Sequence, residues 1–524
     1  MLKKITLLFI LFLTLSCSKS KKTTSDVNNI QPNILFILSD DHTSQAWGIY
    51  GGVLKDYVKN ENIKRLANEG ALLMNAFATN SICSPSRASI LTGQYSHLNK
   101  VYTLNESLPE GHPNIAKTLK DKGYSTAIIG KWHLVKKPEG FDYFNVLPGQ
   151  GVYRDPILKT NENWKDGHDS SSGKKYTGFS TDVITDLTID YLEKRNKNKP
   201  FLMFCNFKAT HEPFDYPDRY QTLYEDDSIP EPPSLFDFGK HTTGRTFEGQ
   251  KLENLGKRWD EATTNNNFWT SYPGLPYPLK GLDSINKRRR IYQKLVKDFM
   301  RSGAAIDDNI GKLLDYLEKE KLADNTIVIY TADQGYFLGE HGFFDKRLMY
   351  EESSRMPFVI RYPKNIKGGQ KIDDIILNID FAALLADYAG IVKPDYMQGQ
   401  SFRGILETND TINSRKQMYY RYWLHQPERP GHFGIRNHRY KLIFFYGQDL
   451  DMKGASKEIT PPMWEFYDLD KDPKELHNAI NESQYDAIIK EMKKQLIEER
   501  KKYKDTDDLN AKMQEILLQN DLIN

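Results

Sequence analysis

The chain has 524 residues, of which 39% are hydrophobic and 27% charged, and this composition excludes disorder on a large scale. Its 72 Lys and Arg residues nearly cancel its 70 Asp and Glu residues, so no bulk field favours nucleic acid or a membrane surface as a partner. The three cysteines are too few for a disulfide scaffold. Because the net charge is close to zero, any attraction for an anionic ligand must come from a local group of positive residues.

The N-terminal segment, residues 1–17, is predicted to be a signal peptide. Lysines precede an apolar run over 5–15 that is too short to cross a bilayer. The run ends at Cys17 in a pattern that resembles a bacterial lipoprotein box, so lipid attachment at Cys17 and ordinary cleavage nearby are the two alternatives. Residues 18–30 are predicted to be a flexible tether. We therefore expect an exported protein in the periplasm or at the outer membrane.

Residues 31–395 alternate buried strands with helices, which predicts an α/β domain. The apolar runs typical of central parallel strands are 33–40, 125–130, 201–207, 326–333 and 357–363. Helical patterns fall near 62–69, 86–92, 113–122, 181–195, 287–320 and 379–389. Cys205, within one apolar run, is predicted to be a buried core residue. The stretch 225–285 has little periodicity and is either a substrate-facing loop or a surface excursion.

Residues 396–524 have a different pattern, which predicts a smaller antiparallel sheet with a covering helix. The strand-like segments are YYRYW, HFGIR, YKLIFFY and WEFYDLD, and a charged helix follows over about 482–503. No linker separates this unit from the first one, so we expect the two to pack together.

Polar residues, most of them ionisable, lie at the ends of four of the predicted strands. They are Asp40 and Asp41, Lys131 and His133, His211, and Asp333 with Gln334. A single Asp at a strand end is usually a cap or a turn residue. Side chains at the carboxyl ends of parallel strands converge on one crevice, however, so four such ends together indicate a functional site.

The residue types at these ends suit a metal ion and an oxyanion. Asp40, Asp41, Asp333 and the amide of Gln334 offer hard oxygen ligands, which favours calcium, with magnesium as the alternative. Nearby donors for a tetrahedral oxyanion are Arg87, Lys131, Lys346, His133 and His211.

The segment CSPSRASILTG at 83–93 resembles the signature of type I sulfatases, in which a maturation enzyme recognises C-x-P-x-R and oxidises the cysteine to formylglycine (3-oxoalanine). NILFILSDDHT, GKWHL, THEP, TADQGYFLGEHG and DKRLMYEESSRMP follow the family's order over roughly 33–363. HFGIR, YKLI and EFYDLDKDP are similar to family members that act on carbohydrates. The resemblance implies an alkaline phosphatase-like sandwich with a large, mostly parallel central sheet, and a smaller C-terminal antiparallel sheet subdomain with a helix.

Carried over by position, the resemblance implies that Cys83 becomes the nucleophile. Calcium would be held by an oxygen of residue 83 together with Asp40, Asp41, Asp333 and Gln334. Gln334 departs from the pattern, because many members have Asn or His there. Arg87 would orient the formylglycine, whereas Lys131, His133, His211 and Lys346 would bind sulfate or move protons. We expect His211 to protonate the leaving alcohol and His133 to assist release of sulfate, although these two roles are interchangeable.

The resemblance thus implies an exported sulfatase. Its substrate would be a sulfated polysaccharide or oligosaccharide, either an algal polymer such as ulvan or carrageenan or a glycosaminoglycan. His425 and His432 are candidate substrate contacts, and packed histidines are the alternative. A phosphate-ester or phosphonate hydrolase of the same superfamily is the rival enzyme class, since fold alone does not separate the two. A noncatalytic glycan-binding lipoprotein is the rival outside enzymes.

Overall fold

The computed structural model describes residues 31–236, 248–262, 272–412 and 414–523. The predicted signal peptide and tether lie outside the described residues. Within the described ranges, no helix is long and apolar enough to cross a membrane.

The main sheet has eight strands in the order β12-β2-β11-β8-β1-β7-β3-β4. Their bounds are β1 (Asn33–Asp40), β2 (Ala71–Phe77), β3 (Ser125–Lys131), β4 (Tyr143–Leu147), β7 (Phe201–Thr210), β8 (Thr326–Ala332), β11 (Arg355–Arg361) and β12 (Gln370–Leu377). β1 runs parallel to both β7 and β8 at the centre of the sheet. The predicted mostly parallel sheet is confirmed.

β11 is antiparallel to β8 and β2, so the prediction of a parallel strand at 357–363 was wrong. The connection from Asp333 to Ser354 contains only short elements and no helix that could return the chain to the opposite edge. β11 therefore starts at the edge where β8 ends, and it must run back.

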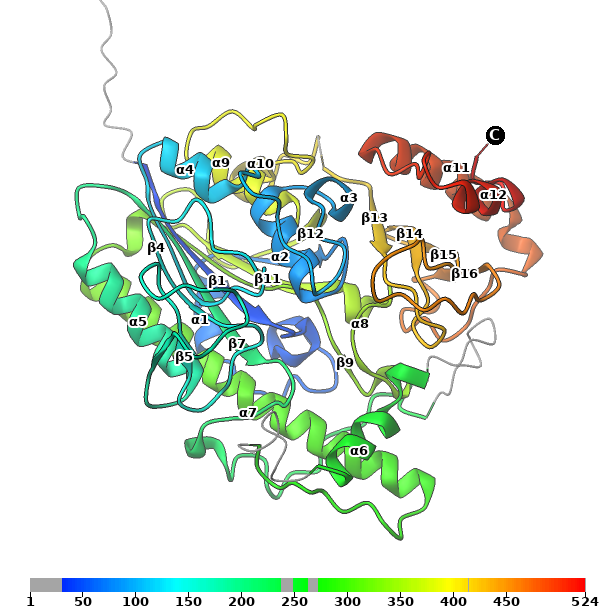
Figure 1. The fold of residues 1–524 in the computed structure, drawn as a ribbon, viewed down its shortest axis with the longest axis horizontal. Helices are drawn as coiled ribbons and strands as arrows, with labels where there is room; N and C mark the ends of the chain where they lie inside the picture. Colours follow the sequence, from blue (N-terminus) through cyan, green and yellow to red (C-terminus); the bar gives the residue numbers. More distant parts are fainter. Residues whose placement is uncertain (1–30, 237–247, 263–271, 413, 524) are drawn as a thin grey trace, which may run out of the picture.

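Helices cover both faces of the main sheet (Figure 1). Along β1, Leu35 and Ile37 share a core with α1 (Glu61–Asn68), α5 (Ser180–Lys194) and α7 (Ser284–Lys319). Phe36 and Leu38 point to the other face, where the core contains residues of α2 (Cys83–Thr92), α4 (Ile115–Asp121) and α9 (Asp380–Tyr388). A strand covered in this way is apolar at every position, which explains the continuous hydrophobic runs.

The C-terminal unit is a four-stranded antiparallel sheet, as predicted. It comprises β13 (Gln417–Tyr422), β14 (His432–Asn437), β15 (Tyr440–Phe445) and β16 (Met463–Asp468), followed by α11 (Asp486–Tyr503) and an unpredicted α12 (Ala511–Gln519). One hydrophobic cluster joins Phe77 and Leu377 of the main sheet to Phe433, Leu442 and Leu496. The two units therefore share a core, and Figure 1 shows them side by side.

The remaining elements are short. They are α3 (Ser96–Asn99), α6 (Leu252–Asp260), α8 (Glu351–Ser354), α10 (Arg403–Thr408), the pair β5 (Ile157–Leu158) and β6 (Lys174–Lys175), and the pair β9 (Phe337–Leu338) and β10 (Phe344–Asp345). One-turn 3-10 helices lie at Ser44–Ala46, Gly48–Tyr50, Asp218–Tyr220, Glu248–Gln250, Ala323–Asn325, Glu340–Gly342 and Ser483–Tyr485.

Candidate active site

Three aspartates meet at the carboxyl edge of the main sheet. Asp40 ends β1, Asp41 follows it, and Asp333 follows the adjacent strand β8. Asp41 has a positive φ of 63°, and its backbone N–H donates to Asp333 Oδ1 at 3.1 Å. One carboxylate oxygen from each of the three lies within 4.8 Å of the others, and all three residues are buried.

Cys83 begins α2 directly beside these carboxylates. Its Sγ lies 3.8 Å from Asp41 Oδ1 and 3.6 Å from Gln334 Nε2. Burial and the negative charge of Asp40 raise the pKa of the Cys83 thiol well above its ordinary value. Because the thiolate is the nucleophilic form, an unmodified cysteine at this position is poorly suited to attack.

Three cations surround the carboxylates. Lys346 Nζ lies 2.5 Å from Asp41 Oδ1, and Lys131 Nζ contacts Asp40. Arg87 donates from Nε to Asp333 Oδ2 at 2.9 Å and from Nη1 to the Lys131 carbonyl at 2.8 Å. Burial opposes ionisation of Asp40, but Lys131, His211 and Arg87 hold its pKa well below the ordinary value.

The arrangement fits a divalent cation bound through oxygen. Burial, together with the charge of Asp40, raises the pKa of Asp333 to about 8. Burial raises the pKa of Asp41 as well. Two buried oxygens, Asp40 Oδ1 and Gln334 Oε1, have no hydrogen-bond partner among the described residues. Hard oxygen donors of this kind, gathered in one buried cluster, are the ligand set that Ca²⁺ prefers.

Both predicted histidines lie next to this cluster. His211 Nδ1 is 2.7 Å from the Glu212 carbonyl, to which it donates, so Nε2 faces Asp41 at 3.8 Å. His133 is buried, and its Nδ1 has no hydrogen-bond partner among the described residues. Burial, followed by the charge of Lys131, holds the pKa of each histidine well below its ordinary value. The division of roles between the two histidines stays a prediction.

Two protein-family models match the chain, and they identify the class of reaction at this site. The sulfatase family model matches residues 32–391, and the model described as N-sulphoglucosamine sulphohydrolase, C-terminal, matches residues 339–502. The chain belongs to the sulfatase family. It is a sulfuric ester hydrolase, as the sequence predicts.

Individual relatives are similar to this sulfatase over nearly its whole length. An N-acetylglucosamine-6-O-sulfatase of Bacteroides thetaiotaomicron is 38% identical over 94% of this chain and 89% of its own. An ulvan-active sulfatase of Formosa agariphila is 26% identical, covering 93% and 84% of the two chains. A protein solved in complex with its substrate, D-glucosamine-2-N,6-O-disulfate, has a TM-score of 0.82 and 36% identity, covering 91% of this chain and 99% of the other.

A cavity of about 580 Å³ opens above the site of the sulfatase. Asp41, Cys83, His211 and Lys346 line it, whereas Arg87, Lys131 and His133 lie behind this wall. The unpredicted lining residues include Gln150, Lys257, Arg258, Arg347 and Arg429. Lys257 and Arg258 lie on α6, so this described part of the stretch 225–285 faces the cavity, which favours the first of the two predicted alternatives.

Lys208 is a further buried residue near the site that the sequence did not reveal. It lies on β7, and its Nζ has no hydrogen-bond partner among the described residues. Burial, with the charge of Lys131, lowers the pKa of Lys208 to about 7. The predicted strand ended at residue 207, whereas β7 continues to Thr210 and holds Lys208 inside it.

His425 and His432 do not line the cavity, so the structure does not support them as substrate contacts. Both are fully buried. His425 Nε2 is 2.8 Å from the Glu458 carbonyl, and His432 Nδ1 is 2.8 Å from the Pro430 carbonyl. The His432 ring also packs against Tyr420 and Phe445. Arg429, between the two histidines in the sequence, is the residue of this segment that reaches the cavity.

Proposed function

We propose that this sulfatase removes the 6-O-sulfate from N-acetylated or N-sulfated glucosamine units of a glycosaminoglycan. The supporting observation is the 38% identity, over nearly the full length of both chains, to an N-acetylglucosamine-6-O-sulfatase. The relative solved with D-glucosamine-2-N,6-O-disulfate supports the same sugar. The ulvan-active relative is less similar, at 26% identity, so a glycosaminoglycan is favoured over an algal polymer.

We further propose formylglycine, made from Cys83 by a maturation enzyme, and calcium as the cofactors. Together they would supply paired hydroxyl groups for attack on sulfur and a positive charge for the sulfate oxygens. Asp40, Asp41, Asp333 and Gln334 would hold the ion with an oxygen of residue 83. Arg87 would orient residue 83, since its guanidinium is fixed by Asp333 and the Lys131 carbonyl.

The remaining polar residues would bind the ester and move protons. Lys346 lines the cavity and can donate to a sulfate oxygen, while Lys131 places a second positive charge behind it. His211 lines the cavity, and in its doubly protonated form it would donate the Nε2 proton to the leaving alcohol oxygen. His133, which lies deeper, would assist release of sulfate.

The substrate is tested with a panel of defined sulfated sugars. Free sulfate and the position of the remaining sulfate are measured for glucosamine 6-, 3- and 2-N-sulfates, and for N-acetylgalactosamine 6-sulfate as the epimer control. We expect kcat/KM for 6-O-sulfated glucosamines to exceed that for the other sugars by about 100-fold or more. Equal rates on the galactose epimer, or a preference for another position, would contradict the proposed substrate.

We also propose export, with a lipid at Cys17, because a basic segment followed by a short apolar run is typical of a signal peptide. Fatty-acid labelling and cell fractionation should place the labelled chain in the envelope. A Cys17→Ala variant should lose the label. Full-length chain in the cytosol that retains Met1 would refute the proposal.

A further inference from the structure

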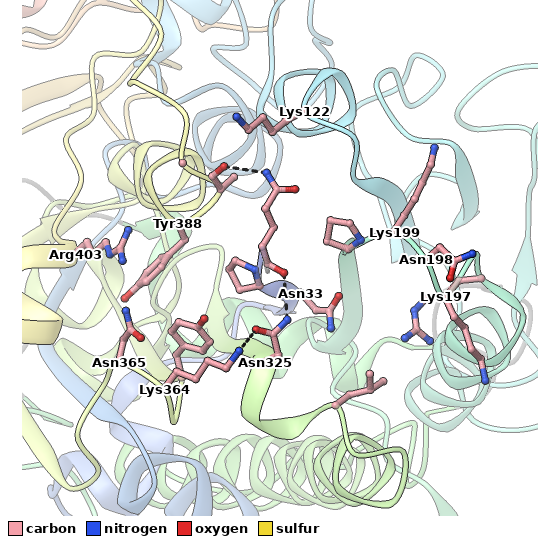
Figure 2. Close-up of a pocket in the computed structure, with 18 residues that line it drawn as sticks. Asn33, Lys122, Lys197, Asn198, Lys199, Asn325, Lys364, Asn365, Tyr388 and Arg403 are labelled. Carbon is pink, nitrogen blue, oxygen red and sulfur yellow. Dashed lines mark hydrogen bonds between the residues drawn. The ribbon is translucent and has the colours of Figure 1, made fainter. Parts of the chain in front are cut away.

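Figure 2 shows a second cavity, of about 770 Å³. It lies at the amino ends of β1, β7 and β8, whereas the active site lies at the carboxyl ends of the same strands. We call it the amino-end pocket, lined by Asn33, Lys122, Arg195, Lys197, Asn198, Lys199, Asn325, Lys364, Asn365, Arg403 and the residues around them. Asn33 starts β1, and Asp40 ends the same strand in the active site. The strand separates the two places by about 23 Å, at roughly 3.3 Å per residue.

The lining of the amino-end pocket is strongly cationic. It contains six Lys and Arg side chains and no Asp or Glu, in a chain with a formal net charge of only +2. The side chains of Lys122, Lys197 and Lys199 are exposed and form no ion pair or hydrogen bond with the residues that the structure describes. Of the others, Lys364 donates to Asn325 at 2.6 Å, and Arg403 is paired with Glu407. Several positive charges are therefore available to a ligand.

The uncharged lining suits a sugar rather than a lipid. Figure 2 shows Asn33 and Asn325 between the cationic side chains, with Asn198 and Asn365 among them. Asn33, Asn325 and Asn365 already hydrogen-bond to other parts of the protein. The exposed side chain of Asn198 forms no hydrogen bond with the residues that the structure describes, so its amide can donate to and accept from sugar hydroxyl groups. Leu322 is the only Val, Leu or Ile residue in the described lining, so the pocket offers little apolar surface to acyl chains.

We propose that the amino-end pocket binds a stretch of sulfated glycan remote from the ester that is hydrolysed. Sulfates of the glycan pair with Lys122, Lys197 and Lys199, and its hydroxyls bind the Asn198 amide. The pocket thereby holds a polymeric substrate on the enzyme. The choice of a glycan, as opposed to another polyanion, rests on the proposed function.

The test reverses the charges of the pocket without touching the active site. Lys122, Lys197 and Lys199 are changed together to Glu, and the control changes Lys490, Lys494 and Lys501, exposed residues of α11, in the same way. Binding of size-fractionated heparin oligosaccharides is measured at several salt concentrations, in a Cys83→Ala background so that the ligand stays intact. Turnover of monosulfated glucosamine is measured with Cys83 present.

We expect the pocket variant to lose at least about tenfold in heparin affinity, with a weaker dependence on salt, and to keep its turnover of the monosaccharide. The α11 control should bind heparin like its parent. Unchanged heparin affinity, or an equal loss in the control, would overturn the proposal. So would a pocket variant that binds heparin normally but loses binding to phosphatidylglycerol vesicles, because the pocket would then be a membrane contact.

The two proposals fail separately. If the parent releases 6-O-sulfate but the pocket variant binds heparin normally, the inference about the pocket is wrong and the proposed function stands. If the parent releases no 6-O-sulfate and the pocket variant still loses heparin affinity, the pocket is a glycan site and the proposed function is wrong.

Discussion

The position of Cys83 makes its thiol a poor nucleophile. Its pKa is raised by burial and by Asp40, so attack by the thiolate is suppressed. The same position lies against the carboxylate of Asp41 and the amide of Gln334. Oxygen atoms attached to the β-carbon of residue 83 would therefore lie within reach of a bound cation.

We predict that Cys83→Ala folds but has almost no turnover, and that Cys83→Ser accumulates a sulfated enzyme. A serine carries one hydroxyl, which can accept the sulfuryl group but leaves no second hydroxyl to expel it. Peptide mass spectrometry checks both points, showing an aldehyde or its hydrate in the active enzyme and an added sulfate on the serine variant. An unmodified thiol in fully active protein would refute the mechanism.

Burial of Lys208 near the active site lowers the stability of the folded chain. The pKa of Lys208 in the folded chain, about 7, lies below the value of about 10.4 expected for an unfolded lysine. Between these two pH values the unfolded chain binds more protons than the folded chain. Burial of the charged Lys208 therefore lowers the free energy of unfolding by its full amount below about pH 7, and by less as the pH rises.

We therefore predict that Lys208→Met increases the free energy of unfolding of metal-stripped protein, and by more at about pH 6 than at about pH 9. Denaturant titration at the two pH values measures the difference, and Lys197→Met, at an exposed position, is the matched control. The variant should also lose roughly tenfold or more in kcat/KM, because it removes positive charge near the reacting anion. A destabilised variant at both pH values would show that Lys208 has a partner that offsets its burial.

At the scale of elements, the ends of β1 and β8 create the candidate metal site. The two strands are adjacent and parallel, so the residues that follow them, Asp41 and Asp333, meet without any long loop. A chain that pairs these strands therefore brings the carboxylates together before any ion binds, and a bound cation would relieve the repulsion between them.

We predict that chelation abolishes turnover and that calcium restores it better than zinc does. Asp41→Ala and Asp333→Ala should lose both bound metal and turnover. Asp345→Ala is the control, because this carboxylate lines the cavity but lies outside the three-aspartate cluster. Metal content measured by mass spectrometry checks the prediction, and full occupancy in both site variants would remove the two aspartates from the ligand set.

The sequence predicted most of the polar residues at the strand ends, but it predicted few of the residues that line the cavity. Buried central strands are continuous apolar runs, so the polar residue that follows each run is conspicuous, as at Asp40 and Asp333. Arg258 and Arg429 lie in segments without periodicity, and only the folded chain brings them to the cavity. The direction of β11 was also missed, because an apolar run covered on both faces reads the same in either orientation.

At the scale of the molecule, a buried ionic network joins the two units. Glu351 in α8 pairs with Arg436 of β14 at 3.1 Å and with Lys441 of β15 at 2.9 Å, and Lys441 also pairs with Glu475. The C-terminal sheet thus contacts α8, which follows the segment that carries Lys346 into the cavity. We infer that the smaller sheet helps to hold this wall of the active site.

We predict that Arg436→Met lowers the free energy of unfolding by roughly 1–3 kcal/mol, because the buried Glu351 loses one of its two cationic partners and keeps Lys441. The control is Arg439→Met, which breaks a more exposed pair with Asp468 and should cost far less. Chemical denaturation measures both values. Equal, small losses would show that the hydrophobic core shared by the two units is sufficient without the network.

The placement of β1 also fixes how the enzyme is oriented when it is held by its N-terminus. Residue 31 enters the fold at the amino end of this strand, and the cavity opens at the other end. A molecule attached to a bilayer or a bead through residues upstream of 31 would therefore have its active-site cavity on the side that faces the medium. Attachment at that end should therefore leave the active-site cavity open to the medium, and it places the amino-end pocket on the attached side.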